Sequence, residues 1–87
     1  MSRYLNEARL HSEKIKYYHE NDGVYGYSQA RYHYNKLSDL VRRSFMSKHN
    51  KNDSIIIQRM VVSAEPLMEE MKQRQDIYLE EKSRDFK

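Results

Sequence analysis

Residues 54–78 decide the fold, and they read SIIIQRMVVSAEPLMEEMKQRQDIY. Apolar side chains recur in this stretch at heptad-like spacing, interrupted at Gln75: Ile57, Val61, Ala64, Met68, Met71 and Tyr78. That spacing places them on one face of a helix. A strand over 55–57 would suit the β-branched residues there, but no second run of similar character exists to pair with it. We therefore expect a long C-terminal helix over about residues 54–84.

Pro66 lies inside this helix and leaves two alternatives open. Within a helix, proline removes one backbone hydrogen bond and clashes with the preceding turn at a cost of about 3 kcal/mol, whereas in a first turn the missing N–H costs nothing. Ser63 could cap a new helix that has Pro66 in its first turn. The sequence thus predicts either one kinked helix or two helices that meet at this proline.

Two shorter helices are expected upstream, over about residues 2–20 and 28–47. The first carries an apolar stripe at spacings of three and four: Tyr4, Ala8, His11, Ile15 and Tyr18. The second repeats the pattern, with Leu40 and Phe45 alongside the stripe: Tyr27, Ala30, Tyr34, Leu37 and Val41. Gly23 suits a left-handed C-terminal cap for the first helix, and Ser28 an N-cap for the second.

The composition agrees with a single all-α domain over residues 1–87. The chain has two Gly and one Pro, which disfavours folds built from many short strands. We expect a small three-helix bundle with a long C-terminal helix, or four helices if the chain breaks at Pro66. A domain of this length buries roughly 64% of the surface that its unfolded chain exposes, so its core is small.

Cysteine and hydropathy bear on location and chemistry. The chain has no Cys, which excludes a disulfide framework and thiol catalysis and leaves the reducing cytoplasm as the expected compartment. Its apolar runs are far shorter than the ~20 residues of a membrane span, so no membrane association is expected. The histidines lack the spacing of a helical zinc pair, and no nucleophile motif or Gly-rich phosphate loop is present. We expect no enzyme activity, metal or cofactor.

The length of the third helix predicts self-association. About 30 residues span ~45 Å, against ~30 Å for each of the other two helices. The third helix should overhang its neighbours and expose part of its apolar stripe. A second copy of the chain could bury this exposed part of the stripe, as small helical proteins often do by forming oligomers. We therefore expect a homo-oligomer that associates through Met68, Met71 and Tyr78.

Tyrosine is unusually frequent, with eight residues in a chain without Trp. Six lie between residues 17 and 34, more than one helix stripe can bury. Three of these fall outside the predicted core stripes: Tyr17, Tyr25 and Tyr32. Tyrosine gives a large contact area at low entropic cost. We expect these three to bind a partner protein. The alternatives are packing against the turn between the first two helices and stacking on the bases of a nucleic acid.

Charge is distributed unevenly along the chain. Residues 1–59 hold eleven Lys or Arg against six acids, and residues 60–87 hold five against seven. Arg42 and Arg43 belong to the basic second helix, where adjacent side chains point ~100° apart, so at least one should face solvent. Such residues could contact an acidic protein surface or a phosphate backbone.

The leading prediction is a non-enzymatic protein-binding module, an adaptor or an inhibitor. Small chains rich in Tyr, Lys and Asn are often carried by phages or mobile elements, an association that rests on composition alone. Two alternatives remain: a nucleic-acid binder that uses the basic second helix, and a structural subunit of a larger assembly.

Overall fold

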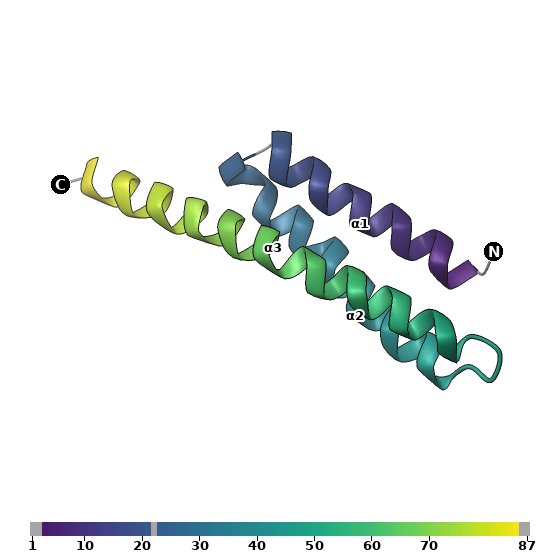
Figure 1. Ribbon diagram of the computed structural model, residues 1–87. Helices are drawn as coiled ribbons and strands as arrows, with labels where there is room; N and C mark the ends of the chain where they lie inside the picture. The colour runs from purple at the N-terminus through teal and green to yellow at the C-terminus, as the bar shows by residue number, and fades with distance from the viewer. Residues whose placement is uncertain (1–2, 22, 86–87) are drawn as a thin grey trace.

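The computed structural model describes residues 3–21 and 23–85. They form α1 (Arg3–Asn21), the short 3-10 helix η1 (Gly23–Gly26), α2 (Tyr27–Met46) and α3 (Lys51–Asp85), with no strand among the described residues. The predicted all-α bundle with a long C-terminal helix is confirmed. The chain reverses direction after α1 and again after α2, so α1 and α3 run parallel (Figure 1). The molecule is elongated, 58 × 20 × 15 Å.

All three helices contribute to one core. The buried apolar residues are Ala8, Ile15, Ala30, Leu37, Leu40, Ile57, Ala64, Met68 and Met71. Each lies on a predicted stripe or directly beside it, because residues three and four apart share a helix face. Three of the nine are alanines, which leave little side-chain volume between the helices. The core is therefore thin and depends on a few larger side chains such as Leu37 and Met71.

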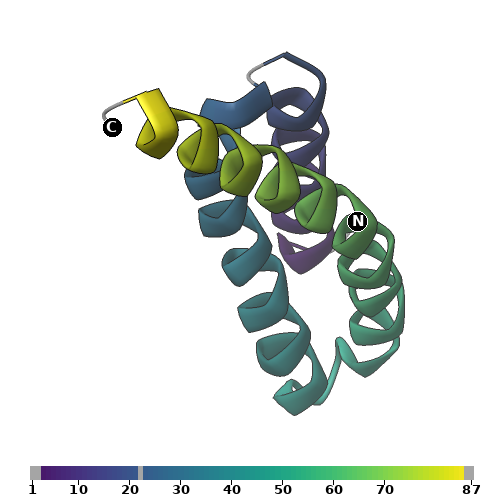
Figure 2. The same cartoon turned by 90° about the vertical axis from the view of Figure 1, so that its left-hand side faces the viewer.

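Pro66 does not divide α3. The helix continues from Lys51 to Asp85, so the alternative of a break at this proline is wrong. Pro66 is exposed and lies opposite the core face that carries Ala64 and Met68. Val62, whose carbonyl loses its usual N–H partner, is exposed as well, so water can bond it. Figure 2 shows α3 changing direction near its middle, as expected for an internal proline.

The bend has a consequence for the second half of α3. This half contacts η1 and the end of α1, and its last turns extend past both (Figure 1). At 1.5 Å per residue α3 is about 52 Å long, so it outruns the other two helices. The predicted overhang is present, but it begins later than expected because η1 covers part of it.

Several helix ends differ from the predicted ones. Gly26 occupies the N-cap of α2 without a side-chain capping bond, so Ser28 lies inside the first turn instead of capping it. Gly23, predicted to end α1, begins η1. α3 begins at Lys51, three residues before its predicted start. The predicted start of the first helix, Ser2, lies outside the described residues.

Phe45 was expected beside the core stripe of α2, and this prediction is wrong. Its side chain is 62% exposed, while the neighbouring Ser44 is fully buried and donates a hydrogen bond to the carbonyl of Val41 at 3.1 Å. Across the short link to α3, Ser54 is also buried and donates to the carbonyl of Lys51 at 2.6 Å. Near the link the two helices are close, and a small hydroxyl that bonds its own backbone fits where a ring would not.

Within the described part of the chain, none of the helices combines the length and the apolar character needed to cross a bilayer.

Candidate protein interface on α1 and α2

Four aromatic side chains form a continuous row across α1 and α2, here called the aromatic row: Tyr17, Tyr18, His33 and Tyr32. Tyr17 and Tyr18 meet edge to face with ring centroids 5.4 Å apart, and Tyr18 stacks on His33 at 6.0 Å. His33 then meets Tyr32 edge to face at 5.1 Å. These are the favourable arrangements of aromatic pairs, so each ring restrains the next.

The two ends of the aromatic row are open to solvent. Tyr17 is 54% exposed and Tyr32 is 56% exposed, whereas Tyr18 and His33 are half-buried. The Nζ of Lys36 lies 5.4 Å from the centroid of the Tyr32 ring, a cation–π contact. The row therefore presents restrained aromatic surface with a cation at its edge. Aromatic residues such as tyrosine are enriched in the cores of protein interfaces.

A pair of histidines supports the middle of the row. The Nδ1 atoms of His11 and His33 lie 2.8 Å apart and bridge α1 to α2. For this hydrogen bond one Nδ1 must donate and the other accept, so at least one ring is neutral. Burial lowers the pKa of both histidines; Glu7 opposes this at His11, and the charges of His11 and Lys14 add to it at His33. No local spacing could predict this pair, because its members are 22 residues apart in the chain.

The histidine pair predicts a stability that falls with acid. Because both folded-state pKa values lie below the ordinary histidine pKa of about 6.5, the unfolded chain takes up protons first. The contribution of the pair is present above about pH 6.5 and is lost as the pH falls through the folded-state pKa values. We expect the urea midpoint to drop between pH 7.5 and pH 5.5, and the H11Q/H33Q variant to show a smaller drop.

The exposed His49 supplies the control for that titration. H49Q should retain the drop seen with the unaltered chain. Equal drops in all three proteins would mean that other groups cause the pH dependence.

Tyr25 does not join the aromatic row. It lies in η1, where its hydroxyl is 3.0 Å from that of Tyr78 and the two rings meet at 5.8 Å. The hydrogen bond raises the pKa of Tyr25 and lowers that of Tyr78. This contact between residues 53 apart ties the second half of α3 to η1. Tyr25, predicted as a partner-binding residue, thus has an intramolecular contact although most of its surface remains exposed.

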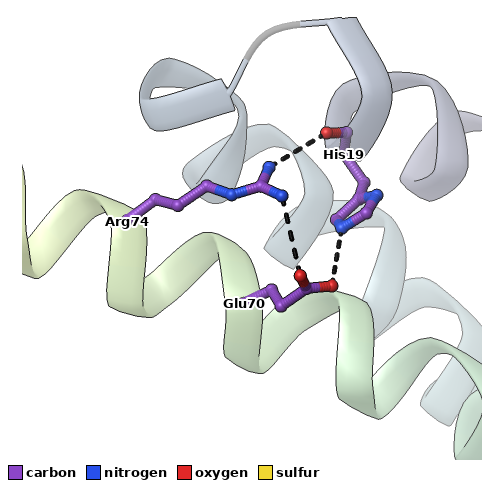
Figure 3. A network of polar contacts seen from close by, with 3 residues as sticks. All are labelled: His19, Glu70 and Arg74. Atoms are coloured by element: carbon purple, nitrogen blue, oxygen red, sulfur yellow. Dashed lines mark hydrogen bonds and ion pairs between the residues drawn. The ribbon is translucent and has the colours of Figure 1, made fainter.

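A polar network closes the same end of the bundle (Figure 3). Glu70 accepts a hydrogen bond from His19 Nε2 at 2.9 Å and forms an ion pair with Arg74 at 3.7 Å. Arg74 also donates to the carbonyl of His19 at 3.2 Å, in the last turn of α1. An arginine at a helix C-terminus donates to a carbonyl that has no partner within the helix, and its positive charge interacts favourably with the negative end of the helix dipole. Together with Tyr78, these groups hold the part of α3 beyond Pro66 against the rest of the molecule.

The two arginines predicted to bind a partner are separate from the aromatic row. Arg42 and Arg43 both face solvent, and both pair with Asp39, at 3.0 and 2.8 Å. They lie about ten residues beyond Tyr32 on α2, which corresponds to ~15 Å along the helix. The shared carboxylate offsets part of their charge. The structure therefore brings Tyr17 and Tyr32 to one surface and leaves the arginines outside it.

The residues predicted for self-association lie largely inside the chain. Met71 is fully buried and Met68 is nearly so, and Tyr78 packs on Tyr25. The premise that the two shorter helices leave these side chains uncovered is wrong for Met68 and Met71, which belong to the shared core. Tyr78 is half-buried, and its described contact is with η1. The apolar residues that α3 exposes near its end are instead Ile77 and Leu79.

Among the described residues, no group of three or more His, Asp or Glu side chains lies close enough to hold a metal ion. Comparison with family models, with curated proteins and with solved structures found no match to the chain.

Proposed function

We propose that this protein is a non-enzymatic helical module of the cytoplasm that binds another protein through the aromatic row, and acts as an adaptor or an inhibitor. The observation that carries the proposal is the combination of exposure and restraint in the row. Tyr17 and Tyr32 are half-exposed, yet each packs edge to face on a half-buried ring. Exposed rings that are already ordered lose little entropy on binding, which favours affinity.

A nucleic-acid function is the second candidate. Rings beside a cation, as at Tyr32 and Lys36, also suit base stacking on a single strand. Arg42 and Arg43, however, share one carboxylate, and residues 60–87 carry more acids than bases. Both features weaken attraction to a phosphate backbone, so a protein partner is preferred.

The test starts from the unaltered chain used as bait in the organism of origin, with nuclease treatment. The affinity of the recovered partner, once purified, is then measured for the Y17A/Y32A variant. Loss of an aromatic anchor costs about 2 kcal/mol or more, so we expect binding at least ~30-fold weaker, mainly through faster dissociation. F45A/M46A removes apolar side chains that are even more exposed, at the far end of α2, and should change affinity only a few-fold.

Salt dependence separates the two candidates. A protein partner predicts a shallow fall of affinity with salt and little effect of R42E/R43E beyond slower association. A nuclease-sensitive complex with a steep salt slope that R42E/R43E flattens, and that Y17A/Y32A leaves intact, would contradict the proposal and favour nucleic acid.

A further inference from the structure

A groove of about 370 Å³ runs between α1 and α3. Its floor is apolar: Met60 and Leu67 of α3 are half-buried and present accessible surface, and the adjoining Ile15 of α1 and Ala64 of α3 are buried. On α3 the lining residues recur every three or four positions from 56 to 67, so the groove follows this helix for about three turns, or ~16 Å. α1 runs parallel to α3 and supplies the opposite wall.

The α3 wall exposes more aliphatic surface than the bundle uses. Ile55, Ile56 and Val62 are 55%, 43% and 55% exposed. Ile56 lines the groove, and the other two border a shallower depression that adjoins it and shares Arg59. β-branched residues have lower helix propensity than the straight-chain residues usual on solvent-facing helix surfaces. These three residues give this part of α3 accessible apolar surface, of a kind that a partner could cover.

The rim of the groove is basic. Lys16 of α1 and Arg59 of α3 stand on opposite walls, and neither forms an ion pair with a described carboxylate. The described lining also includes Arg9 and a single acid, Glu13. An occupant that brings carboxylates to both rims would meet complementary charge at Lys16 and at Arg59.

We propose that this groove binds an acidic amphipathic helix of another protein. An apolar stripe on that helix would lie on the floor between Ile15 and Leu67, and its acidic flanks would meet Lys16 on one side and Arg59 on the other. A helix of about three turns matches the length of the groove. Bound there, it would add a fourth helix that packs against both α1 and α3.

This second surface does not depend on the aromatic row. On α1 the groove wall uses positions 9, 12, 13 and 16, whereas His11 and Tyr18 point to the opposite side of the helix. Tyr17 lies one turn after Glu13, so this end of the aromatic row borders the groove. A chain with both surfaces can hold two partners at once. The inference therefore favours an adaptor over a simple inhibitor.

The experiment uses two synthetic peptides of about four turns with the same leucine stripe, one with glutamate flanks and one with lysine at every glutamate position. Binding of each to the full chain is followed by fluorescence anisotropy at moderate ionic strength. We expect the glutamate peptide to bind at least ~10-fold more tightly than the lysine peptide. Its complex should shift the backbone amide resonances of Ile15, Ala64 and Leu67.

Charge reversal on the rim provides the decisive variant. K16E/R59E should weaken the glutamate peptide at least ~10-fold and favour the lysine peptide. K48E/K51E makes the same change in net charge at exposed sites outside the groove and should alter affinity less than about threefold. Y17A/Y32A should leave peptide binding unchanged, so that this proposal and the proposed function fail separately.

Four results would overturn the inference. In the first, the glutamate peptide does not bind; in the second, K48E/K51E weakens its binding as much as K16E/R59E does. In the third, the amide shifts map to the aromatic row. In the fourth, the unaltered chain self-associates and K16E/R59E abolishes this self-association. The last would show that a second copy, not another protein, occupies the groove. Circular dichroism of each variant confirms that it remains folded.

Discussion

Replacing Met71 by glutamate is expected to unfold the protein. The Met71 side chain is fully buried in the shared core of the three helices, among apolar neighbours. An unpaired carboxylate at such a site costs several kcal/mol, whether it stays charged or takes up a proton. A domain of this length has a free energy of unfolding of roughly 4–13 kcal/mol, so one buried charge removes most or all of it. Loss of the far-UV helical signal and of a cooperative urea transition would record the effect.

Ile77→Glu is the matched control, because it introduces the same charge six residues later on the same helix at a side chain that is 56% exposed. It should change the free energy of unfolding by no more than about 0.5 kcal/mol, as is usual for surface sites. An M71E variant that stays folded would contradict the described core. The comparison also tests self-association: if Ile77 and Leu79 form an interface between copies, I77E should sediment as a monomer where the unaltered chain does not.

Replacing Pro66 by alanine is expected to stabilise the protein, by about 1 to 3 kcal/mol. Proline in a helix interior costs about 3 kcal/mol relative to alanine, through the missing hydrogen bond and the clash with the preceding turn. Pro66 is exposed, so alanine leaves no cavity, and it restores the bond to the carbonyl of Val62. The gain falls short of the full cost because a straighter α3 would strain the contacts of Glu70, Arg74 and Tyr78. Each kcal/mol should raise Tm by roughly 4–8 °C.

Gln73→Ala is the control for this substitution, because it changes an exposed side chain on the same helix and leaves the backbone bonding as it is. Its effect on Tm should be small. A P66A variant less stable than the unaltered chain would show that the bend contributes more through contacts beyond Pro66 than the proline costs. Y25F and R74A each remove a contact that holds α3 beyond Pro66, so each should destabilise the unaltered chain. In that outcome each should destabilise P66A less than it destabilises the unaltered chain.

The periodic pattern of apolar residues was sufficient for the fold class and for most of the burial. Within one helix each residue turns by 100°, so the stripe that contains Ala8 and Ile15 had to share a face, and Tyr17 and Tyr32 had to lie outside the core stripes. The same periodicity explains why α3 continues through Pro66. The apolar register runs unchanged from Ala64 to Met68 on the side opposite the proline, so a break would have sacrificed a continuous core face for one hydrogen bond at the surface.

The three helices, most of their buried residues and the exposure of Tyr17 and Tyr32 could therefore be predicted from the sequence. Only the packing of the helices brings together residues that are distant in the chain: Tyr17 and Tyr32 in one row through Tyr18 and His33, Tyr25 against Tyr78, and Lys16 and Arg59 in the lining of one groove. The physical reason is that the positions around a helix follow from its own repeat. The rotation and offset of one helix against another depend on how side chains of both interdigitate, and no local spacing encodes that.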